Sequence, residues 1–178
     1  MVWIAGQTVT GSSTQVVTFS SIPQTFSHLQ LRVSNIFAVS GTGYFVGMQF
    51  NGDTNNNYAF HRLYGNGSSA GSNGFATGSY PYITTYGGAV QQLAASTYPS
   101  IFVTDVLDYT STNKQKTARS IYGQDANGTG EVGLASGVWL PASPVAITSL
   151  ALTMYVANFA VGTRLDLYGI TTSQVTGA

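Results

Sequence analysis

The chain has 178 residues, no cysteine and twelve formal charges, six basic and six acidic, so its net charge at neutral pH is zero. Charged residues make up 7% of the composition, whereas an average soluble domain carries about 25%. Such a composition excludes the basic surface that nucleic-acid binding requires, a disulfide framework, and any run of the about twenty apolar residues that a membrane-spanning helix needs.

Short segments in which apolar and polar residues alternate recur along the chain between clusters of Gly, Asn, Ser and Pro, which is the pattern of antiparallel strands. In chain order the pattern predicts ten strands, at residues 15–19, 28–34, 44–50, 59–64, 80–86, 100–107, 117–122, 131–140, 147–155 and 164–170. No segment has a 3.6-residue apolar repeat of helical length. The sequence therefore predicts an all-β fold, an antiparallel two-sheet β-sandwich of jelly-roll type with about 8–10 strands.

The domain organisation follows from these strands. Residues 15–178 are expected to form a single β-sandwich domain, and residues 1–14 precede it as a short arm or as an edge strand at Val2–Ile4. The segment Gly65–Gly78 holds too many glycines for a predicted strand. It is expected to be a solvated loop, or a contact element that orders against a neighbouring subunit, because long loops in compact domains are often functional.

Residues with catalytic chemistry are few. The two histidines, His28 and His61, both fall in predicted strands, and no nucleophile elbow accompanies them. Asp105 and Asp108 are the closest carboxylate pair in the sequence, but this spacing alone does not place them across a glycosidic bond. We therefore expect no enzyme activity and no cofactor.

The segment Asn51–Asn57 resembles a calcium loop in its oxygen-bearing side chains, but it contains a single carboxylate, Asp53, and a hydrogen-bonded turn is the better interpretation. Tyr80, Tyr82 and Tyr86 share one face of a predicted strand. They are candidates for a subunit-contact or sugar-stacking surface, the alternative being that they belong to the core.

The charges are unevenly distributed. Seven of the twelve lie between residues 105 and 131, while residues 1–31, 63–104 and 132–163 carry none. Residues 109–116 are predicted to form a water-facing hairpin tip that exposes Lys114 and Lys116. The long neutral stretches suit surfaces that contact another protein, since interface cores are depleted of charge. Alternatively, Ser, Thr and Asn side chains hydrate these stretches without any partner.

Four segments together resemble a known family: Phe19–Arg32, Phe50–Thr54 followed by Asn57-Tyr58, Leu63–Ser68, and Leu167–Ile170. In their order and spacing they are similar to small β-sandwich virion proteins of tailed bacteriophages, which serve as head decoration (cement) proteins or tail-fibre tips. The resemblance spans about residues 19–170. It implies assembly as a homotrimer on the outer surface of the virion and implies no catalysis.

The first functional expectation is a capsid decoration protein, made in the host cytoplasm, that binds the major capsid protein of the phage head. The predicted sandwich occupies residues 15–170, which leaves no room for the anchoring domain that a fibre usually needs. The alternative is a receptor-binding tail-fibre or spike tip that engages host surface glycans. Neither expectation includes nucleic acid or a membrane as a partner.

Overall fold

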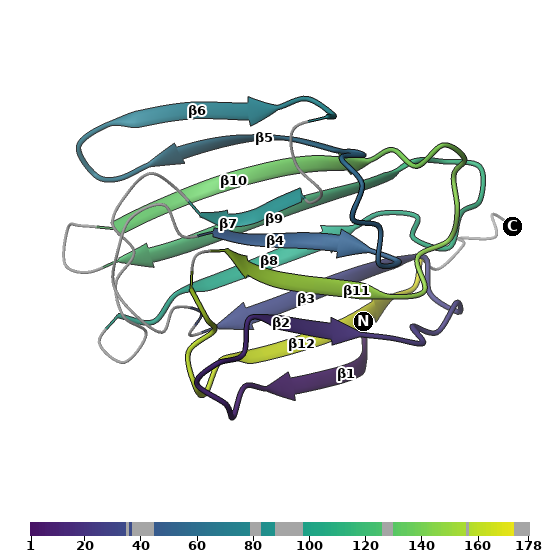
Figure 1. The fold of residues 1–178 in the computed structure, drawn as a ribbon, viewed down its shortest axis with the longest axis horizontal. Helices are drawn as coiled ribbons and strands as arrows, with labels where there is room; N and C mark the ends of the chain where they lie inside the picture. Colours follow the sequence, from purple (N-terminus) through teal and green to yellow (C-terminus); the bar gives the residue numbers. More distant parts are fainter. Residues whose placement is uncertain are drawn as a thin grey trace, which may run out of the picture.

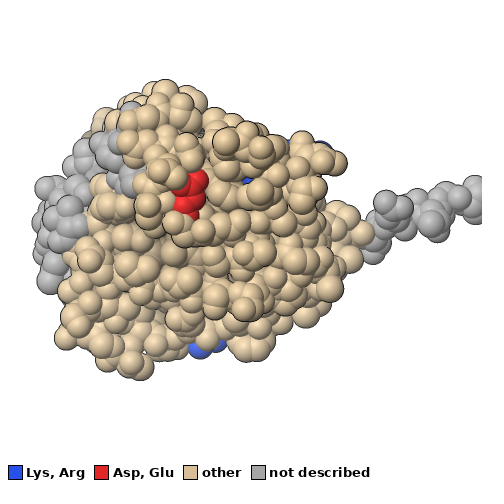
Figure 2. All heavy atoms as spheres, turned by 45° about the vertical axis from the view of Figure 1, so that its right-hand side comes forward, with Lys and Arg blue, Asp and Glu red and all other residues tan. Residues whose placement is uncertain are grey.

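The structure is a computed structural model that describes residues 1–34, 36, 45–78, 83–87, 98–125, 130–155 and 157–172. These residues form twelve β-strands in two antiparallel sheets and contain no helix that could cross a membrane (Figure 1). The predicted all-β sandwich is therefore confirmed. Few charged side chains appear on the face of the molecule that Figure 2 shows, in keeping with a composition of 7% charged residues.

The larger sheet contains eight strands, in the spatial order β1 (Val2–Thr8), β12 (Arg164–Ile170), β3 (His28–Ser34), β8 (Ile101–Val106), β9 (Lys116–Asp125), β10 (Gly130–Trp139), β5 (Tyr58–Gly65) and β6 (Ala70–Phe75). The smaller sheet contains four, in the order β2 (Val16–Phe19), β11 (Leu150–Tyr155), β4 (Phe45–Phe50) and β7 (Ile83–Gly87).

The strand order has the nested pairing of a jelly roll. β1 pairs with β12, β2 with β11, β3 with β8 and β4 with β7, so the outermost strands in the sequence pair with each other and the innermost do likewise. Two hairpins, β5–β6 and β9–β10, are inserted into this frame and pair through β5 and β10. Both extend the same edge of the larger sheet, which therefore has twice as many strands as the smaller one (Figure 1).

Of two predictions about strands, one alternative agrees with the structure and the other prediction is wrong. The N-terminal residues form edge strand β1, as one of the two alternatives held, and this strand belongs to the sandwich rather than preceding it. The expectation that Gly65–Gly78 is irregular is wrong, because Ala70–Phe75 form strand β6 and pair with β5. Backbone hydrogen bonds to β5 stabilise this strand although its glycines disfavour extended structure.

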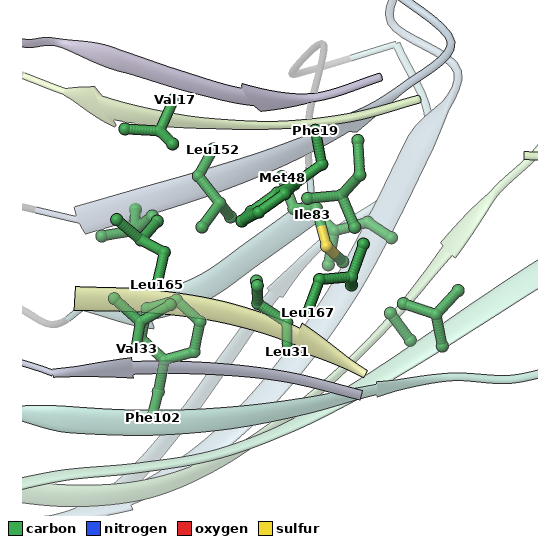
Figure 3. Close-up of a cluster of buried hydrophobic side chains, with 14 of the residues drawn as sticks. Val17, Phe19, Leu31, Val33, Met48, Ile83, Phe102, Leu152, Leu165 and Leu167 are labelled. Atoms are coloured by element: carbon green, nitrogen blue, oxygen red, sulfur yellow. The ribbon is translucent and has the colours of Figure 1, made fainter. Parts of the chain in front are cut away.

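The hydrophobic core lies between the two sheets. Alternate residues of each strand point inward, as the period of two predicts, and Figure 3 shows the two sets of side chains meeting. The smaller sheet contributes Val17, Phe19, Met48, Ile83 and Leu152, and the larger sheet contributes Leu31, Val33, Phe102, Leu165 and Leu167. All ten are at most 5% exposed. Burying each one stabilises the fold by about 1.5–3 kcal/mol.

The loop that follows β4 is a hydrogen-bonded turn, as expected. Asn51 and Gly52 adopt positive φ angles of 51° and 67°. The Asp53 carboxylate accepts hydrogen bonds from the Asn55 and Asn57 side chains at 2.8 and 3.0 Å, and from the Trp139 indole at 2.7 Å. These bonds lower the pKa of Asp53 and leave the loop built around N–H donors, so it does not resemble a calcium site.

Gly137 in β10 provides a test of the packing between the sheets. A Cβ atom at this position would lie 2.4 Å from Ile83 and 3.0 Å from the Ala59 carbonyl oxygen. We expect Gly137→Ala to lower the free energy of unfolding by about 1–3 kcal/mol, because the core has no room for the added methyl group. Chemical denaturation measures this change. Gly123→Ala is the matched control, since its Cβ would meet no atom closer than 3.7 Å; equal losses in both variants would contradict the packing described here.

Candidate functional site

The outer face of the larger sheet presents three rows of side chains that run across the strands. Cross-strand register defines them. The first row is Thr8, Arg164, Ser34, Ile101, Gly123, Val132 and Gly65. The second row is Gly6, Asp166, Arg32, Val103, Ile121, Leu134 and Leu63. The third row is Trp3, Tyr168, Gln30, Asp105, Arg119, Ser136 and His61. In every row the residues belong to β1, β12, β3, β8, β9, β10 and β5, in that order.

The first two rows contain no polar side chain where they cross β8, β9, β10 and β5. This part of the face, here called the apolar band, consists of Leu63, Ile101, Val103, Ile121, Val132 and Leu134. Apart from Val103, which is half-buried, these side chains are 42–62% exposed. Single exposed aliphatic residues are common, but a contiguous group on a regular sheet is characteristic of an interaction surface.

Two hollows adjoin the apolar band. One has a volume of about 570 Å³ and lies at the ends of β9 and β10, where glycines, Ile101 and Val132 line it together with the polar residues Asn66, Gln124, Asp125 and Glu131. We call it the glycine hollow, because Gly65 and Gly123 stand on either side of Val132. The other hollow, of about 500 Å³, lies over β5, β6 and β10, where the polar residues His61, Ser72 and Asn73 line it beside Leu63 and Leu134. Both volumes are within the range of ligand pockets.

The remainder of the outer face is largely polar, and four of the five charged side chains in the three rows form two pairs of opposite sign, the fifth being Arg32. Arg119 lies 3.6 Å from Asp105, and Arg164 donates a hydrogen bond of 2.9 Å to Asp166. The Arg164 hydrogen bond lowers the pKa of Asp166. Arg32 lies over the Tyr168 ring at 5.4 Å from its centroid. No single sign of charge predominates on the described part of this face, so it offers no electrostatic footprint for a polyanion.

A buried charged cluster lies on the inner side of the same strands. Arg62 and Glu131 are 3.3 Å apart and almost fully buried, and the Tyr122 hydroxyl donates a 2.7 Å hydrogen bond to Glu131. Burial, together with the Glu131 carboxylate, raises the pKa of Tyr122, so the hydroxyl stays protonated and keeps donating. Asn73 of β6 accepts a 2.7 Å hydrogen bond from Arg62. The cluster therefore links β5, β6, β9 and β10.

The hairpin at residues 109–116 is only partly as predicted. Lys114 is exposed and pairs with Asp108 at 2.7 Å, as expected of a hydrated tip. The expectation that Lys116 is exposed is wrong: this residue is 1% exposed. Its ammonium group donates hydrogen bonds to the carbonyl oxygens of Ser111 and Lys114, which satisfies the charge inside the hairpin. Burial lowers the pKa of Lys116.

The predicted tyrosine surface cannot be assembled in full. Tyr80 and Tyr82 lie outside the described residues, and only the backbone of Tyr86, in β7, is described. Nothing in the described residues therefore tests this candidate, and sequence reasoning did not single out the apolar band. The sequence did contain a pattern that indicates the apolar band. Ile101 is followed by Phe102 and Ile121 by Tyr122, so both faces of these strands carry large apolar residues.

The side chains considered for catalysis have structural partners. Asp108 carries a positive φ of 47° and receives a hydrogen bond from Lys114, which lowers its pKa. His28 accepts a 2.9 Å hydrogen bond from the Asp108 backbone, and Asp105 accepts one from Gln30. His61 lies on β5 against Gly74. Within the described residues, no three His, Asp or Glu side chains are placed to hold a metal ion.

Comparison with known proteins leaves the family of this chain open. No protein-family model matches the sequence, and no curated protein matches it either. A solved structure of an aerolysin-like protein from Bombina maxima has 6% sequence identity and a TM-score of 0.15, over 86% of this chain and 91% of that one. At this TM-score the likeness supports no conclusion about fold or function.

Lys116 and Lys114 make a matched pair for testing the hairpin. We expect Lys116→Met to lower the free energy of unfolding by about 1–3 kcal/mol, because two carbonyl oxygens lose a charged donor. Lys114→Met should change it by less than about 1 kcal/mol, because its ion pair is exposed to water. Urea denaturation of both variants measures the difference. If Lys114→Met proved the more destabilising, the assignment of the buried lysine would be contradicted.

The buried cluster provides a second test. Glu131→Gln keeps the shape of the side chain but leaves Arg62 buried without a counter-charge, so we expect a loss of about 3–5 kcal/mol in unfolding free energy. Asp105→Asn removes the carboxylate from the exposed pair with Arg119 and should cost less than about 1 kcal/mol. The two variants are compared by thermal and chemical denaturation. Similar losses would show that Arg62 and Glu131 do not act as a buried pair.

Proposed function

We propose that this protein is a structural interaction protein of a virus particle, a capsid decoration protein that assembles as a homotrimer and binds the major capsid protein of a tailed-bacteriophage head. The observation that carries the proposal is the apolar band, a regular uncharged patch on a rigid sheet. A surface of this kind suits permanent contact with protein, because aliphatic side chains gain free energy when water is removed from them. The resemblance of the sequence to phage virion proteins points in the same direction.

The proposed mechanism is mass action. A protein that binds the assembled shell, and not its dissociated subunits, lowers the free energy of the shell relative to any broken or disassembled state. Many copies that each contribute a modest binding energy then resist the pressure of packaged DNA. Such a role requires a rigid fold with contact surfaces, and the jelly-roll frame with its extended sheet meets this requirement. No bond is made or broken in this mechanism.

The alternative is a receptor-binding tip of a tail fibre or spike that engages host surface glycans. The observation that favours it is the second hollow, of about 500 Å³, where His61, Ser72 and Asn73 supply hydrogen-bonding groups beside the aliphatic Leu63 and Leu134. Sugars are bound by such mixtures of polar and apolar groups. The two functions differ in how many copies a particle carries.

Copy number tests the choice between them. We expect quantitative densitometry of purified particles to give hundreds of copies of this protein, close to the number of shell subunits, because a decoration protein occupies the whole lattice. The shell protein in the same lane is the internal control. A few dozen copies would overturn the decoration role in favour of a fibre tip, and absence of the protein from purified particles would overturn both.

A further inference from the structure

Four Asn-Gly pairs occur in the sequence, and the fold holds them in different ways. Asparagine before glycine is chemically labile, because glycine has no Cβ to keep its backbone nitrogen away from the preceding side-chain amide. Three of the pairs lie among the described residues: Asn51-Gly52 in the turn after β4, Asn66-Gly67 between β5 and β6, and Asn73-Gly74 within β6. The fourth, Asn127-Gly128, lies outside the described residues.

The reaction of such a pair needs only the chain and water. The glycine nitrogen attacks the asparagine Cγ and forms a new C–N bond, while the Cγ–Nδ2 bond breaks and ammonia leaves with the proton that the glycine nitrogen gives up. Water then opens the resulting succinimide ring at either carbonyl group, which yields aspartate or isoaspartate. Negative charge develops on the asparagine Oδ1 during the attack, so hydrogen-bond donors placed around this oxygen accelerate the step.

Asn66 has such donors. Its Oδ1 accepts hydrogen bonds from the backbone N–H groups of Ser68 and Ser69 at 3.1 and 2.8 Å, and from the hydroxyls of the same two residues at 3.1 and 3.2 Å. These bonds fold the side chain forward along the chain, toward the side on which the Gly67 nitrogen follows. Hydrogen bonds to a charged oxygen are roughly twice as strong as those to a neutral one, so the four donors stabilise the intermediate more than the starting amide.

The surroundings of Asn66 permit the reaction. Residues 66–69 form the tip of the β5–β6 hairpin, at the outer end of the extended sheet (Figure 1). Gly67 and Ser68 are exposed, so water reaches the ring that must be opened. Gly67 has a positive φ of 87°, a conformation that favours glycine. The turn therefore requires the same residue that makes Asn66 labile.

Asn51 is held against a separate segment of the chain. Its Oδ1 accepts hydrogen bonds from the backbone N–H groups of Thr148 and Ser149 at 2.8 and 3.1 Å. Its Nδ2, the group that would have to leave, donates a 2.8 Å hydrogen bond to the Ala146 carbonyl oxygen. Attack by the Gly52 nitrogen would require the side chain to give up these bonds, so the turn after β4 protects Asn51.

Asn73 is fixed within a strand. Its Oδ1 accepts a 2.7 Å hydrogen bond from the buried Arg62. Asn73 and Gly74 pair in regular register with Arg62 and His61 of β5, which keeps their backbone extended. Ring closure would have to break the Arg62 bond and distort the strand. Among the three described pairs, the donors around Asn66 thus promote the attack, while the partners of the other two asparagines oppose it.

We propose that Asn66 is a site of spontaneous modification, at which the Gly67 nitrogen closes a succinimide and the asparagine becomes aspartate or isoaspartate. The inference goes beyond the proposed function and does not depend on it. The new carboxylate adds one negative charge to a protein of zero net charge. It lies in the lining of the glycine hollow, which already contains Asp125 and Glu131. This part of the surface therefore becomes more acidic as the protein ages.

The experiment follows the wild-type full chain during incubation in mildly alkaline buffer, once folded and once unfolded in concentrated urea. Proteolysis and mass spectrometry give the rate at each Asn-Gly pair separately. In the folded protein we expect Asn66 to react at least about tenfold faster than Asn51 and Asn73, because the hydrogen bonds that hold those two raise their barriers. In urea the three rates should be similar, since all three asparagines precede glycine. Asn66 should react no more slowly folded than unfolded.

Two variants separate the effect of the donors from that of the loop. The double variant Ser68→Ala, Ser69→Ala removes both hydroxyl donors and should slow Asn66 by about threefold to tenfold, the effect of losing a hydrogen bond of ordinary strength. Ser72→Ala removes an exposed serine of the same hairpin that does not contact Asn66, and it should leave the rate unchanged. An equal effect of the two changes, or a faster reaction in the double variant, would overturn the role of the donors.

The comparison of folded and unfolded protein decides the proposal as a whole. Equal rates at the three pairs in the folded protein, or a faster reaction at Asn51 or Asn73, would overturn it. Slowing of Asn66 on folding to the same extent as Asn51 would show that its four hydrogen bonds protect the amide, which also overturns the proposal. None of these results changes the number of copies expected on a particle, so the decoration role stands or fails separately.

Discussion

The antiparallel register of β8, β9, β10 and β5 is the constraint on which the surface properties of this protein depend. Because side chains alternate with a period of two, a slip of one residue in any of these strands would bury its apolar outer residues and expose its core residues. The observed register instead aligns Val103, Ile121, Leu134 and Leu63 in one continuous row. The apolar band is thus a product of strand pairing, and its side chains come from segments that are distant in the sequence.

The buried cluster of Arg62, Glu131 and Tyr122 supports that register from the inner side. Its members belong to β5, β10 and β9, and their hydrogen bonds can form only if these strands are aligned as observed. Buried ion pairs seldom add much net stability, because desolvation offsets the attraction between the charges. Their contribution here is better understood as specificity: a shifted strand would leave a charge buried without a partner. The hairpins β5–β6 and β9–β10, which extend the larger sheet and carry most of the apolar band, are therefore held in one arrangement.

Much of the fold could be predicted from the sequence, because period-two alternation records which residues are buried. The strands at 28–34 and 164–170 match the prediction to the residue. β6 could not be predicted, since its glycines lack strand propensity and its pairing with β5 alone stabilises it. The distribution of charges along the sequence was misleading about exposure in one respect. It does not distinguish the exposed Lys114 from the buried Lys116 and Glu131. The candidate site was not predictable for the same reason: whether Ile121 faces water depends on the sheet around it.

The paired charges on the outer face have a consequence for how the protein behaves in solution. Arg119 with Asp105, and Arg164 with Asp166, cancel within a few ångströms, which leaves Arg32 as the one net charge of the described outer face and lets little net field extend from it. Dissolved ions weaken the attraction between distant charges, and this surface generates little attraction of that kind. Association through the outer face should depend weakly on ionic strength, and salts that are excluded from protein surfaces should strengthen it. A particle built on such contacts would tolerate wide variation in the salinity of its surroundings.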